Sequence, residues 1–221
     1  MKGLNNLGAT CWLNALVQCL RVCKNWEEPP TDQKSAFYKL VRGETDDTTQ
    51  FLSEFPSLHF GNSPSDSQEA LLHILDKLDL KEFVGEVTQT IVYPGGRSVS
   101  KTPCTVWFGQ GQNKPDVISD YVDEHGKVHN VAMIQRELTK IPEILVSDVV
   151  ENELFGKPLI GCVIWGFGHY VAYVKEAGDW WYVNDHHAHI KVENEVLPKG
   201  VYLAFYGVGK TYTPRTHFEE A

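Results

Sequence analysis

The sequence has no long apolar run. None of its hydrophobic stretches approaches the 18 or more residues that mark a membrane-spanning helix, and its first residues lack the apolar core of a signal peptide. We therefore expect no membrane partner. Because the chain opens almost at once on a motif described below, we also expect that it was cut from a longer protein.

Cysteine is scarce, and its spacing is irregular. The five cysteines are odd in number, and none of them stands in a Cys-x-x-Cys motif. This pattern argues against a disulfide framework and against a zinc finger. It favours a reducing compartment, so we expect a cytoplasmic protein. The five are Cys11, Cys19, Cys23, Cys104 and Cys162.

Positive charge is in deficit. The chain has 20 Lys and Arg against 29 Asp and Glu, which gives a net charge of -9. Nucleic acid and anionic membranes are therefore poor partners, whereas a basic substrate segment would be attracted. The apolar fraction of 42% and the charged fraction of 22% are those of an ordinary globular protein. A chain of 221 residues can form a single domain, 1–221, with one sizeable core shared by two lobes.

The first part of the chain is predicted to be helical. From Cys11 to Val22 nearly every residue is apolar, and the polar Asn14, Gln18 and Arg21 fall at helical spacing. They predict one polar stripe on an otherwise buried helix.

A second helix is predicted to begin near Ser65. Ser65 and Gln68 have the spacing of a capping box. The residues that follow place one apolar face at helical spacing, consisting of Leu71, Ile74, Leu75 and Leu78.

The character of the chain changes after about residue 84. Segments rich in Val, Ile and aromatic residues predict strands at 87–93, 159–164, 170–174, 180–183 and 201–206, with a hairpin at 121–133. Helices come first and antiparallel strands second. The order predicts an α+β fold in which a helical lobe, about 1–84, packs on a β-rich lobe, about 85–221, with an active-site cleft between them.

Cys11 stands where a loop meets the first predicted helix. The free N–H groups and partial positive charge of a helix N-terminus favour a thiolate over a thiol. The same N–H groups can hold the oxyanion that forms when a thiolate attacks a carbonyl carbon. The simpler alternative is that Cys11 is a small buried hydrophobe, as we expect of Cys19.

His169 begins a predicted strand about 160 residues after Cys11, close to the ~130–150 residues typical of papain-type proteases. A hairpin that turns near Ala177-Gly178 would bring Asn184 nearly opposite His169. Neighbours across two strands lie about 5 Å apart, so Asn184 could bond one imidazole nitrogen and leave the other for Cys11. This arrangement predicts a papain-type cysteine protease.

Four motifs, in this order, resemble those of the ubiquitin-specific proteases. Residues 3–20, GLNNLGATCWLNALVQCL, are similar to the cysteine box of that family. Residues 66–72, DSQEALL, are similar to its Gln-Glu-Phe box, with Ala70 where Phe is usual. GHYVAY at 168–173 and WYVND at 181–185 resemble the histidine box, and YLAFY at 202–206 resembles the closing strand.

The resemblance implies a papain-like fold and a deubiquitinase that cleaves after the C-terminal Gly-Gly of ubiquitin or a ubiquitin-like protein. It places the nucleophile on Cys11, the base on His169 and the third catalytic residue on Asn184. It places an acid that can share that role on Asp185 and the oxyanion-hole amide on Asn6.

The same resemblance implies a set of substrate-binding residues. The Gln-Glu-Phe box supplies acids for an arginine in the modifier tail, and the histidine box lines the channel beside the nucleophile. The residues are Asp66, Gln68, Glu69, Gly168 and Tyr170. No cofactor and no metal are implied, and we expect a monomer.

The chain also departs from that family. Residues 80–168 are fewer than the family has there, and they lack the paired cysteines of its zinc-binding fingers. We therefore expect that the zinc-fingers subdomain and much of the surface that grips ubiquitin are absent. Residues 11–15, CWLNA, also resemble the nucleophile region of compact viral papain-like proteases, those of the aphthovirus leader and nidovirus enzymes.

The sequence is compatible with three hypotheses about function. The first is a deubiquitinase that can also release itself from a viral polyprotein in the host cytoplasm. The second is a protease that cuts only its own polyprotein. The third is an inactive ubiquitin-binding module, against which the intact set of Cys11, His169 and Asn184 argues.

A cluster of histidines raises the question of a metal. Alternation along a strand places His187 and His189 on one face and His186 on the other, so we do not expect a three-histidine metal site.

Overall fold

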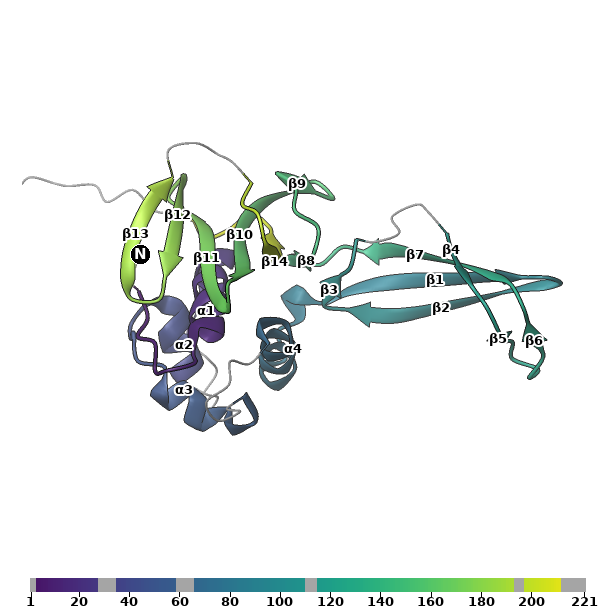
Figure 1. Ribbon diagram of the computed structural model, residues 1–221, viewed down its shortest axis with the longest axis horizontal. Helices are drawn as coiled ribbons and strands as arrows, with labels where there is room; N and C mark the ends of the chain where they lie inside the picture. Colours follow the sequence, from purple (N-terminus) through teal and green to yellow (C-terminus); the bar gives the residue numbers. More distant parts are fainter. Residues whose placement is uncertain (1–2, 28–34, 59–65, 110–114, 193–196, 212–221) are drawn as a thin grey trace, which may run out of the picture.

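The computed structural model describes residues 3–27, 35–58, 66–109, 115–192 and 197–211. Its helices all lie in the first part of the chain: α1 (Cys11–Cys23), α2 (Ser35–Arg42), α3 (Thr49–Glu54) and α4 (Ser67–Leu78), with short 3₁₀ turns at Pro56–Leu58 and Lys81–Phe83. The strands begin at Gly85. Figure 1 shows the helices gathered against one part of the β-structure and a long arm of strands that projects away from both.

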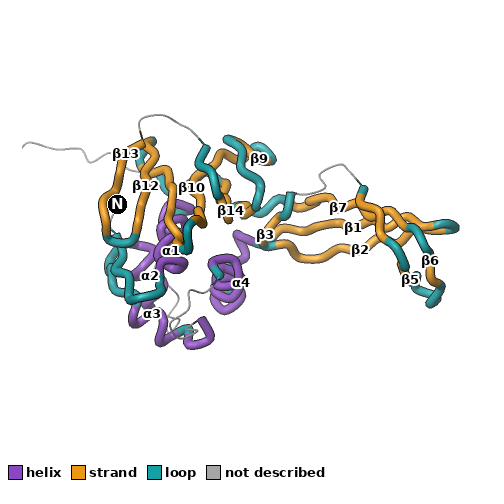
Figure 2. Tube along the Cα trace, in the orientation of Figure 1, coloured by secondary structure: helices purple, strands orange, loops and turns teal. Residues whose placement is uncertain are grey.

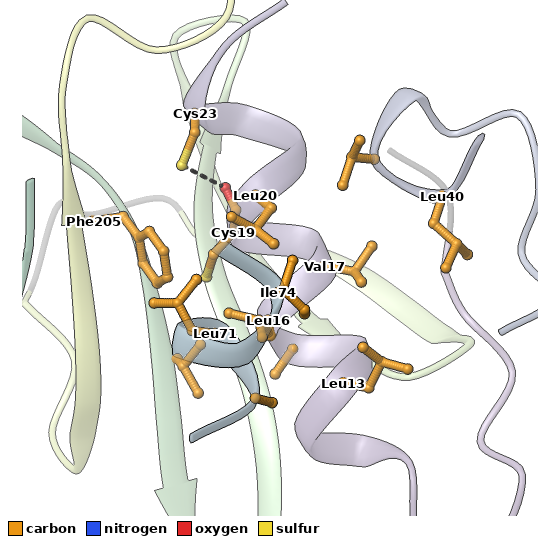
Figure 3. Close-up of a cluster of buried hydrophobic side chains, with 14 of the residues drawn as sticks. Leu13, Leu16, Val17, Cys19, Leu20, Cys23, Leu40, Leu71, Ile74 and Phe205 are labelled. Carbon is orange, nitrogen blue, oxygen red and sulfur yellow. Dashed lines mark hydrogen bonds between the residues drawn. The ribbon is translucent and has the colours of Figure 1, made fainter. Parts of the chain in front are cut away.

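Helix α1 is the centre of the fold, and the predicted helix is confirmed. All 13 of its residues are buried, because α2, α4 and the strands β10 and β11 all pack against it. Figure 3 shows Leu16 and Val17 of α1 beside Leu71 and Ile74 of α4, with Phe205 of the sheet close by. A helix that is apolar nearly all round is expected to be enclosed in this way.

The polar stripe of α1 is buried as well. Asn14 and Gln18 are 2% and 1% exposed, and Arg21 is 7% exposed. The Arg21 guanidinium donates to the backbone oxygens of Leu40 in α2 and of Thr45 in the loop that follows α2, so the stripe binds this helix and its loop to α1. Burial lowers the pKa of Arg21 to about 10, although neighbouring acids favour its charged form.

Helix α4 begins where the sequence placed it, but with a different cap. Ser65 lies outside the described residues. The N-cap is Asp66, whose side chain accepts hydrogen bonds from the backbone N–H groups of Gln68 and Glu69. The predicted apolar face, consisting of Leu71, Ile74, Leu75 and Leu78, is buried as expected.

The body of the β-structure is an eight-stranded sheet. Its order is β13-β12-β11-β10-β14-β8-β3, and β9 pairs with β10 beside that path. All pairs are antiparallel except β3 with β8. The strands are β3 (Val106–Trp107), β8 (Leu145–Ser147), β9 (Glu153–Leu154), β10 (Lys157–Gly166), β11 (His169–Glu176), β12 (Asp179–Asn184), β13 (His187–Val192) and β14 (Val201–Tyr206). The predicted strands at 159–164, 170–174, 180–183 and 201–206 are therefore confirmed.

The arm is a separate four-stranded antiparallel sheet with the order β2-β1-β7-β4. Its strands are β1 (Gly85–Tyr93), β2 (Gly96–Cys104), β4 (Asp116–Ile118) and β7 (Ala132–Lys140), and a small hairpin of β5 (Tyr121–Val122) and β6 (Val128–His129) lies near its tip. The predicted strand 87–93 and the hairpin within 121–133 are confirmed. Figure 2 shows that the arm consists of strands and loops alone.

The arm lies in the stretch from which we expected the zinc-fingers subdomain to be absent. Paired cysteines are indeed missing, since Cys104 at the end of β2 is its only cysteine. Long strands nevertheless project from the body in this stretch (Figure 1). Nine-residue strands that pair along their whole length, as β1 and β2 do, need no metal to form a ladder.

Candidate active site

Cys11 is the first residue of α1 and is 4% exposed. The N-cap residue, Thr10, makes no side-chain cap to the helix. Its hydroxyl instead accepts a hydrogen bond from the backbone N–H of Leu7, within the preceding loop. Thr10 therefore leaves the backbone N–H groups of the first turn of α1 uncapped, at the end of the helix where Cys11 lies.

The other four cysteines lie in surroundings that keep them as thiols. Burial raises the pKa of Cys19 and of Cys23, and it raises that of Cys162 to about 12. Burial also raises the pKa of Cys104. The Cys23 thiol donates to the backbone oxygen of Cys19 at 3.2 Å, within the core that Figure 3 shows. Both residues are core thiols, as expected.

His169 begins β11 directly after a tight turn. The turn residues Phe167 and Gly168 have φ of 51° and 76°, and Gly166 pairs with His169 across the hairpin. Strand β11 packs against α1, the helix that Cys11 begins.

Asn184 bonds His169, and the predicted hairpin is confirmed. The strands turn at Ala177-Gly178, with Glu176 opposite Asp179. The Nε2 atom of His169 lies 2.8 Å from the Oδ1 atom of Asn184. Continued along the strand, the register sets Asn184 two residues away from His169, so the two side chains meet diagonally on one face.

The Asp185 carboxylate contacts three other side chains of the site, those of His169, Asn6 and Asn14. It lies in the turn after β12 with φ of 49°, and its side chain is 8% exposed. Its Oδ2 atom is 3.7 Å from His169 Nε2 and accepts a hydrogen bond from Asn6 at 2.8 Å. Its Oδ1 atom accepts one from Asn14 at 2.7 Å. A carboxylate with this many donors is held in one orientation.

The backbone of Asp185 also binds the segment before the nucleophile. Its carbonyl oxygen accepts from the N–H of Leu4 at 3.1 Å. A Cβ atom on Gly3 would stand 2.7 Å from that oxygen, which is closer than real Cβ atoms come. Glycine at this position therefore permits the segment to lie against the turn.

Asn6 is fixed from both ends of its amide. Its Oδ1 atom accepts from the N–H groups of Gly8 and Thr10, at 3.0 and 3.3 Å. Its Nδ2 atom donates to Asp185. An amide nitrogen carries two hydrogens, so the bond to Asp185 leaves one for another acceptor. An oxyanion could use that hydrogen.

Asn14 was not among the residues that we predicted for the site. It appeared in the sequence as one member of the stripe on α1. The structure shows that it lies one turn after Cys11 and bonds Asp185, and that it also donates to the backbone oxygens of Leu4 and Asn5. The signal was present: a polar side chain at i+3 from a candidate nucleophile on an apolar helix.

Of the predicted substrate residues, Asp66 has the most defined contacts. One carboxylate oxygen caps α4, and the other accepts from the Tyr202 hydroxyl of β14. Burial and the bond to Asp66 raise the pKa of Tyr202. Asp66 therefore caps α4 and at the same time links this helix to β14. Gln68 is half-buried and Glu69 is exposed in the first turn of α4.

Tyr170 joins β11 to the start of α4. Its hydroxyl forms hydrogen bonds with Ser67, and burial, Asp66 and Cys11 together raise its pKa. The Ser67 hydroxyl in turn donates to the backbone oxygen of Trp12. The start of α4, the first turn of α1 and the strand that carries His169 therefore converge beside Cys11.

Two of the three histidines that follow Asp185 have described side chains. His186 and His187 are exposed, with ring centroids 3.8 Å apart, while the side chain of His189 lies outside the described parts. Among described residues, no group of three or more His, Cys, Asp and Glu could hold a metal ion. Along the same stretches, no helix has both the length and the apolar character that crossing a membrane requires.

The fold was compared with solved structures, and its sequence with known families. It is similar to a chain of the SAGA Ubp8/Sgf11/Sus1/Sgf73 DUB module bound to ubiquitin aldehyde, with a TM-score of 0.69 and 18% identity over 96% of this chain and 70% of that one. The same module bound to monoubiquitin gives 0.68 and 18%, with the same two shares. The yeast SAGA DUB module with a mutant Sgf73 gives 0.67 and 18%, over 96% and 69%.

No family model matches the sequence, and no curated protein matches it. At 18% identity the likeness establishes the fold. The chain thus has the α+β fold of a ubiquitin-specific protease catalytic domain, as the four motifs predicted.

Proposed function

We propose that this protein is a thiol-dependent hydrolase that cleaves the peptide or isopeptide bond after the C-terminal Gly-Gly of ubiquitin or a ubiquitin-like modifier. The observation that carries the proposal is the 2.8 Å contact between His169 Nε2 and Asn184 Oδ1, on a hairpin packed against the helix that Cys11 begins. The solved structures of similar fold support the choice of modifier, since two of them are bound to ubiquitin or its aldehyde.

The bond to Asn184 decides which nitrogen of His169 acts as the base. The Oδ1 atom of Asn184 can only accept, so Nε2 carries the hydrogen and Nδ1 is the basic nitrogen. His169 Nδ1 takes the proton of Cys11, and the thiolate attacks the carbonyl carbon of the terminal glycine. The oxyanion is held by the Cys11 backbone N–H and by the free amide hydrogen of Asn6.

The second half of the cycle restores the enzyme. The tetrahedral intermediate collapses to a thioester as His169 gives its proton to the leaving amine. A water molecule then attacks the thioester while His169 accepts one of its protons. The carboxylate of the modifier leaves, and the proton returns to the sulfur of Cys11. Asp185 assists by holding Asn6, and its Oδ2 atom lies 3.7 Å from Nε2 of the imidazole.

Substrate contacts follow from the surroundings of Cys11. Glu69 is exposed at the start of α4 and is our choice for an arginine near the end of the modifier tail, with Asp66 and Gln68 beside it. Gly168 has no Cβ atom to obstruct an approaching chain, and Tyr170 forms a wall of the channel. A monomer in the cytoplasm remains part of the proposal. The comparisons give no support to a viral origin or to processing of a polyprotein.

Reaction with electrophiles tests the proposal directly. We would treat the protein with ubiquitin and ubiquitin-like proteins that bear a C-terminal electrophile, and read the products by intact mass. We expect a single adduct for the wild type and for Cys104→Ala, and none for Cys11→Ala. Iodoacetamide near pH 6 should label Cys11 first, because burial keeps the other four cysteines as thiols. Adducts on another cysteine, with Cys11 unmodified, would refute the mechanism.

A further inference from the structure

The N-cap residues of α1, α3 and α4 differ in what their side chains do. Asp66, the N-cap of α4, has φ of −81° and ψ of 126°, and it accepts from two backbone N–H groups of its helix. Thr10 of α1 and Thr48 of α3 have ψ of 11° and −3°, and neither makes a side-chain cap. A capping side chain usually goes with the extended backbone that Asp66 has. The hydroxyl groups of the two threonines therefore do not serve the helices that they begin.

The two threonines differ in the partners of these hydroxyl groups. Both residues are buried, with Thr10 6% and Thr48 0% exposed. The Thr48 hydroxyl has no hydrogen-bond partner within the parts of the chain that the structure describes. The Thr10 hydroxyl has two partners, Leu7 and Asn6, both in the loop that precedes Cys11. Of this matched pair, Thr10 is the one that uses its hydroxyl group.

The first partner of the Thr10 hydroxyl is a backbone group. The N–H of Leu7 donates to Thr10 Oγ1 at 3.0 Å. Leu7 is 49% exposed, so water could satisfy this N–H in an open loop. Gly8 follows with φ of 114°, a backbone conformation that residues with side chains rarely adopt. The bond is therefore not needed to satisfy a buried donor, and its effect is to close the loop around the turn at Gly8.

The second partner is the side chain of Asn6, the proposed amide of the oxyanion hole. Thr10 Oγ1 lies 3.5 Å from Asn6 Oδ1, and the backbone N–H groups of Gly8 and Thr10 donate to the same oxygen. A hydroxyl group can accept from Leu7 and donate to Asn6 at the same time. Three donors around Oδ1 disfavour the flipped amide, in which the NH₂ group would face them. The Nδ2 atom is thereby directed to Asp185, 2.8 Å away.

We infer that Thr10 is a positioning residue for the oxyanion hole, because its hydroxyl group closes the loop and fixes the orientation of the Asn6 amide. The inference rests on the proposed function and adds to it a residue that acts through Asn6. Donors to an oxyanion are effective when they are in place before the charge develops, since no reorganisation then accompanies the reaction. Thr10 should therefore affect the chemical step and not the binding of the modifier.

Matched valine substitutions at the two threonines test this role. Valine has the branched shape of threonine without the hydroxyl group. The rate is measured on ubiquitin that carries a fluorogenic C-terminal amide, and the affinity for uncleaved ubiquitin is measured in a Cys11→Ala background. We expect Thr10→Val to lower kcat about tenfold, the most that one neutral hydrogen bond supplies, and to change KM and the affinity less than about twofold. Thr48→Val should keep the wild-type kcat.

A second pair of variants repeats the comparison in a smaller side chain. Thr10→Ser and Thr10→Ala differ by one hydroxyl group, and we expect the serine variant to be faster by about the same factor of ten. Thermal midpoints of all variants report on folding. Equal rates for serine and alanine, or an equal loss of kcat in Thr48→Val, would show that the hydroxyl group of Thr10 does not position the site.

A double-mutant cycle with Asn6 separates action through the oxyanion hole from an independent effect. Asn6→Ala should lower kcat about a hundredfold or more, and Thr10→Val should cost little further in that background. Losses that multiply, or a wild-type kcat in Thr10→Val while Asn6→Ala is impaired, would overturn the inference alone. A wild type that cleaves no modifier and takes no modifier electrophile would overturn the proposed function and this inference with it.

Discussion

A histidine is bonded to the side-chain oxygen of an Asn or Asp in the body of the protein and again near the tip of the arm. In the body, His169 Nε2 lies 2.8 Å from Asn184 Oδ1. In the arm, His129 Nε2 lies 2.9 Å from Asp123 Oδ2. The two bonds have nearly the same length and use the same ring nitrogen, so bond geometry alone does not separate them.

The surroundings of the two histidines differ. The side chain of His129 is 5% exposed, and the rings of Tyr93 and Tyr121 lie 4.5 and 6.3 Å from it. The side chain of His169 is 36% exposed and stands on the strand that packs against the helix of Cys11. We call the buried pair of His129 and Asp123 sealed, because a substrate cannot reach it, and such a pair stabilises only the local turn. We call the partly exposed pair of His169 and Asn184 open, because its imidazole can exchange a proton with a substrate.

The largest expected effect is on the pair in the body. Loss of the group that orients a catalytic histidine can cost about 10⁴ in kcat, and less when a neighbour takes its place. Because Asp185 lies 3.7 Å from the same nitrogen, we expect Asn184→Ala to lower kcat by a smaller factor than Asn184→Ala combined with Asp185→Ala. The measurement is kcat on a modifier with a fluorogenic C-terminal amide.

The pair in the arm supplies the control. His129→Gln removes the corresponding imidazole from a place that no part of the proposed mechanism uses, so kcat on the same substrate should stay at the wild-type value. If the double variant of the body keeps wild-type kcat, the third catalytic residue is elsewhere. If His129→Gln lowers kcat as much as Asn184→Ala does, the distinction between open and sealed pairs fails.

A smaller effect is expected at Asn14, which sharpens the comparison within the body. Asn14 donates to Asp185 at 2.7 Å, and a hydrogen bond to a charged group contributes about 1.5–3 kcal/mol. We expect Asn14→Ala to lower kcat about tenfold with little change in KM. Because Asn14 would act through Asp185, its effect should largely vanish in an Asp185→Ala background, which a double-mutant cycle measures.

Gln18→Ala is the matched control for Asn14. Gln18 lies one turn further along the same buried stripe, where its side-chain oxygen accepts a hydrogen bond from Arg21. Its loss should lower the thermal midpoint without changing kcat. If effects of Asn14→Ala and Asp185→Ala on kcat simply add, Asn14 serves the packing of α1 alone.

Much of the body could be predicted from sequence because its signals are local. The apolar run that starts at Cys11 specifies a buried helix, and Ala177-Gly178 specifies the turn that brings Asn184 to His169. Contacts between distant segments carried no such signal. Asn14 and Asp185 are 171 residues apart, and only the assembled fold shows that they bond.

The arm was harder to predict for a physical reason. Strand β2 is exposed on both faces for most of its length, so it lacks the alternation of apolar and polar residues by which a half-buried strand is recognised. Its partner β1 has that alternation only in part. We therefore found β1 and the hairpin near the tip, but not the sheet that joins them.

The smallest expected effect is at Asp123, and it concerns the arm alone. A hydrogen bond from His129 and bonds from the N–H groups of Lys127 and His125 lower the pKa of Asp123 to about 2. A carboxyl whose pKa is depressed in the folded state adds stability above its unfolded pKa of about 3.9, and loses it only as pH falls through the folded pKa. The hairpin of Tyr121–Val122 and Val128–His129 should therefore keep its amide protection down to about pH 3. In Asp123→Asn the amides of this hairpin should lose protection at every pH, with no change in kcat on a peptide substrate.

Hydrogen exchange of the hairpin amides between pH 3 and pH 7 measures the protection in both proteins. Protection in Asp123→Asn equal to that of the wild type would show that the aromatic rings, and not the ion pair, hold the tip.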